Sequence, residues 1–177
     1  AAPAAAEGAI VTFGVRPTAP SAAYGYIRPG EGEGAVSPVA AFIEKPPLAE
    51  AAAHVAEGLL WNSGNFLFRP DVLLAETERL HPGLVGPVKA ALANATTLGP
   101  GRLSLGADFA AAPRISIDFA VMEKTAAAAV LHAAGIGASR RAEAPLPLSS
   151  FRWNEVIFRS FQSGNLKQLD WLIFQSL

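Results

Sequence analysis

The ten residues from Trp61 to Pro70 (WNSGNFLFRP) constrain the fold of this chain more than any other stretch. Their first half combines a tryptophan with Asn, Ser and Gly, residues that favour turns, and Phe66 to Phe68 is an apolar run of strand-forming residues that Pro70 ends. A polar turn at the mouth of a buried strand is a frequent place for a ligand site in α/β folds. An ordinary loop that enters a core strand would give the same pattern.

Composition indicates one globular domain and excludes several classes of protein. The 177 residues are 51% hydrophobic and 16% charged, which is enough apolar material to bury a core. A formal net charge of −1 offers no electrostatic footprint for nucleic acid or an anionic membrane, and no apolar run is long enough to predict a membrane span. The absence of cysteine excludes disulfides and thiolate metal sites, and it fits a reducing, cytoplasmic location.

The spacing of apolar residues predicts alternating strands and helices, as in an α/β fold. We expect a polar loop at residues 96–106, and beyond Lys124 the regular pattern fades. Ser116 is expected to cap a helix, because it precedes an acidic residue and an apolar run. The remaining expected strands cover residues 9–15, 24–27, 36–43 and 66–68, and the helices cover 48–57, 72–80, 86–94 and 116–124.

Glu44 and Lys45 stand at the carboxyl end of a predicted strand, directly before a predicted helix. The carboxylate can accept hydrogen bonds from two neighbouring sugar hydroxyls, and the ammonium can bind a phosphate as a point charge. The pair therefore suits a sugar phosphate, although a solvated Glu-Lys pair in a loop would have the same sequence.

Four further positions carry groups suited to a sugar. Gly25 lacks a Cβ and lets the backbone approach a ligand, and Tyr24 beside it can pack on a sugar ring; strand packing in a hairpin is the alternative. Asn62 offers a donor and an acceptor to a pair of hydroxyls. Asp118 carries a carboxylate that could face a sugar or a metal, or could serve only at a helix N-terminus. The histidines lie far apart, without the spacing of metal ligands.

Five segments of the chain stand out together: residues 10–17 (IVTFGVRP), 24–27 (YGYI), 42–46 (FIEKP), 61–66 (WNSGNF) and 116–125 (SIDFAVMEKT). Their order and spacing resemble those of one enzyme family, the mannose-1-phosphate guanylyltransferases.

The resemblance covers residues 9–125 and implies a fold of the α/β class, a partial Rossmann-like (GT-A type) nucleotidyltransferase domain with a mixed sheet. Residues 1–125 would be its sugar-phosphate-binding half. Residues 126–177 would be a divergent tail, either disordered or containing an amphipathic helix at 165–177.

The activity that this resemblance implies is transfer of GMP from GTP to mannose 1-phosphate, giving GDP-mannose and pyrophosphate, with Mg²⁺ neutralising charge. Glu44 and Lys45 would hold the sugar phosphate. Gly25 and Asn62 would contact the mannosyl ring, and Asp118 would lie in the same pocket. Tyr24, packed on the sugar, completes the expected substrate-binding set, and Lys45 and Asp118 are the expected catalytic residues.

The chain departs from the family pattern at both ends of the resemblance. It has no Gly-rich GTP loop before residue 9, which predicts a fragment that lacks the GTP-binding half. Beyond residue 125 the expected metal-binding aspartate has no counterpart, since residues 133–141 (AAGIGASRR) contain no acidic residue. No Mg²⁺ ligand is therefore found in this chain.

These departures keep two alternatives open. The chain could be an inactive fragment that only binds a sugar phosphate or acts as an interaction module, or it could belong to a related nucleotidyltransferase with another sugar or base. The expected partners are mannose 1-phosphate and GTP, with no nucleic acid and no membrane. A missing half would also leave a sheet edge unpaired, so that self-association into a homo-oligomer is possible.

Overall fold

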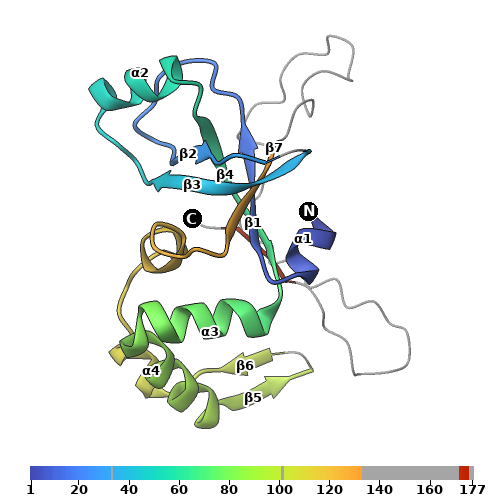
Figure 1. Ribbon diagram of the computed structural model, residues 1–177. Coiled ribbons are helices and arrows are strands. Elements are labelled where there is room, and N and C mark those ends of the chain that lie inside the picture. Colours follow the sequence, from blue (N-terminus) through green and yellow to red (C-terminus); the bar gives the residue numbers. More distant parts are fainter. Residues whose placement is uncertain (33, 101, 133–171, 176–177) are drawn as a thin grey trace.

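The computed structural model describes residues 1–32, 34–100, 102–132 and 172–175, the last of these by backbone alone. Strands and helices alternate along the chain, as the apolar pattern predicts (Figure 1). The helices are α1 (Ala2–Ala6), α2 (Leu48–Ala56), α3 (Pro70–Leu80) and α4 (Pro82–Ala93), with a 3-10 turn η1 (Ala107–Ala111) and a π-helical turn η2 (Asp118–Met122). The strands are β1 (Ile10–Val15), β2 (Tyr26–Pro29), β3 (Val36–Ile43), β4 (Leu60–Phe68), β5 (Thr96–Gly99), β6 (Arg102–Ser104), β7 (Ala128–His132) and β8 (Leu172–Gln175).

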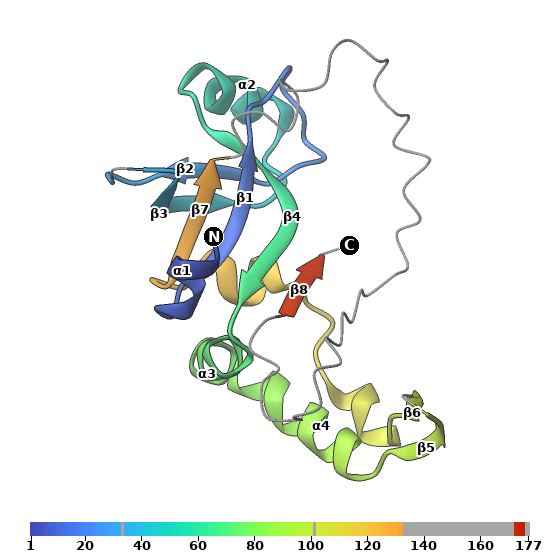
Figure 2. The ribbon, with the colours of Figure 1, turned by 90° about the vertical axis from the view of Figure 1, so that its right-hand side faces the viewer.

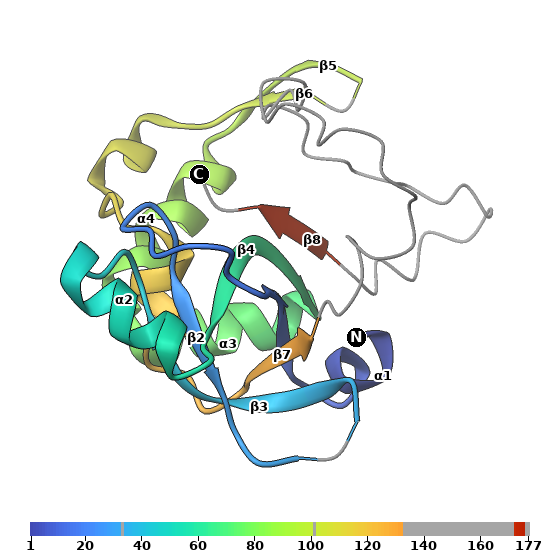
Figure 3. The same ribbon diagram turned by 90° about the horizontal axis from the view of Figure 1, so that it is seen from above.

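The strands of the main sheet pair in a closed ring. β1 is parallel to β7, and the antiparallel pairs β7–β3, β3–β2, β2–β4 and β4–β1 complete the circuit. β2 and β3 run across β1, β4 and β7, and β8 lies outside the ring, beside β4 (Figures 1, 2 and 3). The sheet is mixed, as predicted, and each ring strand pairs with at least two other strands over part of its length. These pairings do not test whether the chain self-associates, which stays a prediction.

Three apolar clusters hold helices and turns against the ring. The largest joins the sheet to α3 and η2, and its most deeply buried members are Ile10, Ile27, Phe66, Val121 and Val130. A second cluster packs α1 on β1, and a third packs α2 on β2 and β4. Because α3 and η2 cover the face of β1 that carries Ile10, side chains on that face meet the 118–122 turn.

The polar residues Asn62 to Asn65 lie inside β4, and the prediction of a turn at the mouth of a strand is wrong. Thr12 pairs with Phe66 and Gly14 pairs with Asn62, so that one residue of β1 faces three residues of β4. Such a bulge leaves backbone groups without ladder partners and bends the strand. Gly64 lies in it with a φ of 72°, a conformation that glycine adopts without a steric penalty. A bulge and a turn therefore require the same residue types here.

Two other expectations were wrong in detail. The expected loop at 96–106 contains the β5–β6 hairpin, because its Thr and Leu residues can form strands and Gly99 can adopt a φ of 148°. The expected helix at 116–124 is only the single turn η2, in which Glu123 N donates to Asp118 O five residues earlier. Ser116 Oγ accepts one long hydrogen bond, at 3.5 Å, from Phe119 N.

The sheet continues past residue 125, the predicted boundary, because β7 is a ring strand. Residues 172–175 of the expected helix at 165–177 form β8 instead, and the rest of that helix lies outside the described residues. No helix in the described part of the chain is long and apolar enough to cross a membrane.

Replacing Phe66 by Ala should unfold the ring more easily, because Phe66 is fully buried in the largest cluster. We expect a loss of about 3–5 kcal/mol in the free energy of unfolding, measured by urea denaturation. Phe109→Ala is the matched control, since Phe109 is 50% exposed and its loss should cost below about 1 kcal/mol. Equal losses in the two variants would contradict this description of the core.

Candidate functional site

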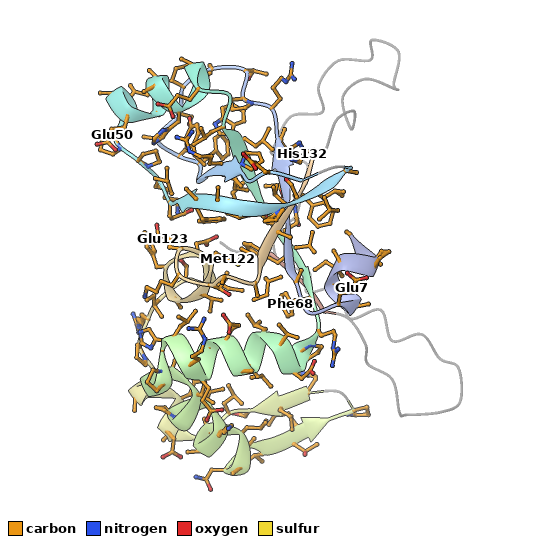
Figure 4. The ribbon with its side chains drawn as sticks, viewed as in Figure 1. Glu7, Glu50, Phe68, Met122, Glu123 and His132 are labelled. Atoms are coloured by element: carbon orange, nitrogen blue, oxygen red, sulfur yellow. The ribbon has the colours of Figure 1, made fainter. Side chains whose placement is uncertain are left out.

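The polar residues predicted to bind a sugar come from four separate segments. Gly25 directly precedes β2, Glu44 directly follows β3, Asn62 lies at the start of the β4 bulge, and Asp118 begins η2. Since β2 pairs with both β3 and β4, the ring brings the first three together, and η2 lies between β3 and α3, where Figure 4 labels Glu123 and Met122.

Asn62 is the centre of the hydrogen bonds in this region. Its Oδ1 accepts from Thr12 Oγ1 at 2.8 Å and from Gly64 N at 3.0 Å, and its Nδ2 donates to Asp118 Oδ1 at 3.1 Å. Its backbone N donates to Gly25 O at 2.8 Å. Asn62 is 7% exposed and Asp118 is 2% exposed, so these polar groups depend on one another for hydrogen bonds.

Gly25 and Glu44 are in direct contact. A Cβ built at Gly25 would lie 2.5 Å from Glu44 Oε2 and 3.4 Å from Asn62 Cβ. The first distance is too short for any side chain, so that glycine is required for the carboxylate of Glu44 to remain in place. The sequence predicted that a ligand could approach the backbone of Gly25 closely. In the structure, the group that lies close to Gly25 is the carboxylate of Glu44.

Glu44 and Lys45 form an asymmetric ion pair. Lys45 Nζ lies 3.2 Å from Glu44 Oε1, with the lysine side chain 54% exposed and the glutamate side chain 7% exposed. Lys45 has a φ of 46°, a left-handed conformation that costs a residue with a Cβ about 1 kcal/mol. Glu123 supports this turn, because its Oε1 accepts a hydrogen bond from Glu44 N at 3.1 Å.

The charges around Glu44 are mostly negative. Burial raises the pKa of its carboxyl, and the neighbouring charges of Asp118 and, more weakly, Glu123 raise it further. The hydrogen bond and charge of Lys45 act in the opposite direction without cancelling these effects. The surroundings of Glu44 therefore disfavour the charged form of its carboxyl. Carboxyl groups with a raised pKa are common at ligand-binding sites.

Tyr24 provides an aromatic surface next to Gly25. Its ring centroid lies 4.7 Å from that of Trp61 with the planes tilted by 42°, and Tyr24 remains 38% exposed. Trp61 Nε1 is buried, and no hydrogen bond to it is found in the described part of the chain. Tyr24 therefore stays partly accessible next to Gly25, as packing on a sugar would require.

The structure brings together all six residues predicted for the site, and it adds two that the sequence did not single out. Thr12 and Glu123 contact Asn62 and Glu44 respectively. Thr12 could have been noticed as a polar residue on the same face as Ile10 and Gly14, at the alternating spacing of a buried strand. Nothing in the sequence alone marks Glu123. Whether any of these residues binds substrate stays a prediction.

The described residues do not fit a resident Mg²⁺. No group of three or more acidic or histidine side chains in the ranges that the structure describes could hold a metal ion. Asp118 Oδ1 already accepts from Asn62, and Glu44 is paired with Lys45. A resident magnesium needs open carboxylate oxygens in near-octahedral geometry, and these two side chains do not provide that arrangement.

A pocket of about 220 Å³ lies between α3, α4 and η2, and none of the predicted site residues lines it. Its walls are almost entirely apolar, which suits neither a phosphate nor a sugar. It is lined by Leu73, Thr77, Leu84, Ile115, Ile117, Ala120 and Val121. The polar cluster is therefore the better candidate site.

This chain belongs to the nucleotidyl transferase family, because the family model described as Nucleotidyl transferase matches residues 1–97. The match covers β1 to β4 and hence Gly25, Glu44, Lys45 and Asn62. It also agrees with the observed mixed α/β architecture.

Within this family, the chain is homologous to mannose-1-phosphate guanylyltransferases. It is 46% identical over 130 residues to the Mannose-1-phosphate guanylyltransferase of Sinorhizobium fredii, an alignment that covers 72% of this chain and 25% of the relative. It is also 46% identical over 133 residues to the Xanthan biosynthesis protein XanB of Xanthomonas campestris, covering 74% of this chain and 28% of the relative. The chain thus spans about a quarter of the length of the curated relatives that it matches.

A solved structure gives the same relationship in three dimensions. The crystal structure described as mannose-1-phosphate geranyltransferase from Thermus thermophilus superimposes with a TM-score of 0.63 at 39% identity. The alignment covers 73% of this chain and 36% of that one. The architecture described above is therefore that of a nucleotidyltransferase-like domain.

Replacing Glu44 by Gln should stabilise the chain at neutral pH. Because the pKa of Glu44 is raised in the folded state, the protonated carboxyl stabilises the fold. This stabilisation is fully present below the usual pKa of 4.5, and it is lost as the pH rises through the higher pKa of the folded state. The advantage of Glu44→Gln over the unmodified chain, measured as a difference in thermal midpoint, should therefore grow as the pH rises from 4.5 to 7.

Glu76→Gln is a control of opposite sign. The hydrogen bonds of Glu76 to Arg79 and then to Thr125 lower its pKa, so that its stabilising effect is present above 4.5 and is lost as the pH falls below that value. Glu76→Gln should therefore destabilise the chain at pH 7. The same sign in both variants at pH 7 would contradict the electrostatics described here.

Proposed function

We propose that this chain supplies the sugar-phosphate-binding half of a nucleotidyltransferase that transfers GMP from GTP to mannose 1-phosphate. The observation that carries the proposal is the convergence of Gly25, Glu44, Asn62 and Asp118, from four segments, into one connected polar cluster. The names and identities of the relatives supply the choice of sugar and base. We also propose that the ring is part of a Rossmann-like, GT-A-type domain.

The polar cluster suits a sugar because it offers donors and acceptors fixed before the ligand arrives. Asn62 is held by hydrogen bonds to three other residues, and Glu44 is held against Gly25. Preorganised polar groups lose little conformational entropy on binding and reject ligands that leave them unpaired. In this proposal the mannosyl hydroxyls lie on Glu44 and Asn62, and Tyr24 covers one face of the ring.

Lys45 suits the phosphate of the same ligand. Its side chain is more than half exposed, so that its ammonium can leave Glu44 and contact a phosphate without being pulled out of a packed core. Without this cation the cluster would repel a sugar phosphate, since Glu44, Asp118 and Glu123 are all acidic. Lys45 therefore determines whether an anionic ligand can be bound.

The proposed reaction joins a phosphate oxygen of mannose 1-phosphate to the α-phosphorus of GTP, and pyrophosphate leaves as the bond from the α-phosphorus to the bridging oxygen breaks. Positioning and electrostatics dominate catalysis of this kind. Lys45 would hold the attacking phosphate in line, and Asp118 would act at the same pocket through its contact with Asn62. Mg²⁺ would supply charge neutralisation in this chemistry, and the described residues do not offer it a set of ligands.

Two observations favour a second candidate, a fragment that binds a sugar phosphate without transferring GMP. The chain spans about a quarter of its curated relatives, and no Gly-rich GTP loop is found in its sequence. Use of another sugar or base is the third possibility. We further propose a cytoplasmic location, where GTP and sugar phosphates are available, and the expected association into homo-oligomers stays a prediction that sedimentation velocity can test.

Calorimetric titration with mannose 1-phosphate tests the sugar half of the proposal. The unmodified chain should bind, and Glu44→Ala should weaken binding at least about tenfold, because hydrogen bonds to a charged group are lost. Glu50→Ala is the matched control, since Glu50 is an exposed residue of α2 that is not part of the cluster, and should leave the dissociation constant unchanged. Absence of binding by the unmodified chain would refute the proposed site.

An assay for pyrophosphate and GDP-mannose, with GTP, mannose 1-phosphate and Mg²⁺, separates the two candidates. Product formed by this chain, and lost in Lys45→Ala, would establish transfer and rule out the binding-only fragment. Binding of mannose 1-phosphate without any product would favour the fragment. Replacing mannose 1-phosphate by glucose 1-phosphate, and GTP by ATP, in the same assay tests the choice of sugar and base.

A further inference from the structure

Thr12 lies at the junction between the β4 bulge and the rest of the ring. Its side chain is fully buried on β1, opposite Phe66, where a valine of the same shape would fit. Its hydroxyl contacts both ends of the bulge, because Oγ1 lies 2.8 Å from Asn62 Oδ1 and 3.3 Å from Asn65 O. A buried hydroxyl costs free energy unless it is paired, so the presence of threonine here is explained by these contacts.

The contacts of Asn62 fix which way its amide points. Oδ1 accepts two hydrogen bonds, from Thr12 Oγ1 and Gly64 N, while Nδ2 donates to Asp118 Oδ1. A reversed amide would place Oδ1 against the carboxylate oxygen of Asp118 and Nδ2 against the N–H of Gly64. Both contacts would be repulsive, so that only the observed orientation satisfies every partner.

The two donors to Oδ1 differ in origin. Gly64 N–H belongs to the same bulge as Asn62, two residues further along β4, so it does not connect the amide to another strand. Thr12 comes from the neighbouring strand, which β7 holds on its other side. The hydroxyl of Thr12 therefore ties the amide to the fixed part of the ring, and it determines where Nδ2 lies relative to Asp118.

We propose that Thr12 is a positioning residue of the sugar site, which holds the Asn62 amide in the one orientation that pairs with Asp118. The expected effect of Thr12 on ligand binding rests on the proposed function, in which Asn62 contacts the sugar. The inference goes beyond that function by assigning a role to a residue that is fully buried and so out of reach of a ligand. Without the hydroxyl, Asn62 would keep its bonds to Gly64 N and Asp118 but would lose its tie to β1, so that its amide would be held less firmly in the orientation that pairs with Asp118.

Thr12→Val tests this role, because it removes the hydroxyl and keeps the shape of the side chain. The first measurement is the exchange with water of the Asn62 side-chain amide protons in a ¹⁵N-labelled chain, with the signals assigned by their loss in Asn62→Asp. Removing the Thr12 hydrogen bond should speed this exchange by about tenfold. The dissociation constant for mannose 1-phosphate should rise by about the same factor.

Two further variants separate positioning from general stability. Thr12→Ser keeps the hydroxyl and should restore both slow exchange and affinity. Thr77→Val makes the same chemical change in α3, where the hydroxyl donates to Leu73 O of its own helix, and it should alter neither measurement. If Thr12→Val does not fold, Thr12→Cys, a poor donor of similar size, replaces it in the comparison.

The outcomes distinguish this inference from the proposed function. Unchanged exchange of the Asn62 amide in Thr12→Val would overturn the positioning role, whatever the affinity. Equal affinity of a folded Thr12→Val and the unmodified chain would also overturn it. Faster exchange in a chain that never binds mannose 1-phosphate would support the control of Asn62 by Thr12 and refute the proposed ligand.

Discussion

The rest of this structure depends on one buried oxygen, Asn62 Oδ1, which accepts two hydrogen bonds. The β4 bulge interrupts the ladder with β1, and backbone groups at such a break need other partners if the ring is to close. The Asn62 side chain supplies one for Gly64 N, and it also reaches Asp118 on η2. The same group thus completes the sheet and orients the site, so that fold and candidate function cannot be altered separately at this position.

The sequence predicted those parts of the fold that depend on local pattern. The strands near residues 9–15 and 36–43 and the helix near 72–80 were confirmed, because alternation, proline and apolar spacing act within a few residues. The β4 bulge was missed, since a bulge and a turn both require Asn, Ser and Gly. The ring itself could not be predicted, because the parallel pairing of Ile10 with Ala128 joins residues far apart in the chain.

The candidate site could be predicted only in part, and for a different reason. Chemistry marks Glu44 and Asn62 as groups that bind hydroxyls, but only the resemblance to a family indicated that they would meet Asp118. The structure supports that grouping through the Asn62–Asp118 hydrogen bond and the contact of Gly25 with Glu44. Thr12 escaped notice because its contribution lies in orienting another side chain, and a sequence does not record orientation.

The parallel strand β7 has a consequence for the order in which this chain folds. β7 lies between β1 and β3, so the ring cannot close until residues 128–132 have been synthesised and have reached the sheet. Bringing together segments so distant in sequence is slow, because the entropy of closing a long loop is lost before contacts compensate for it. On the ribosome the first four strands would wait, with apolar faces exposed, for the last ring strand. Chaperone demand should therefore be highest just before β7 emerges.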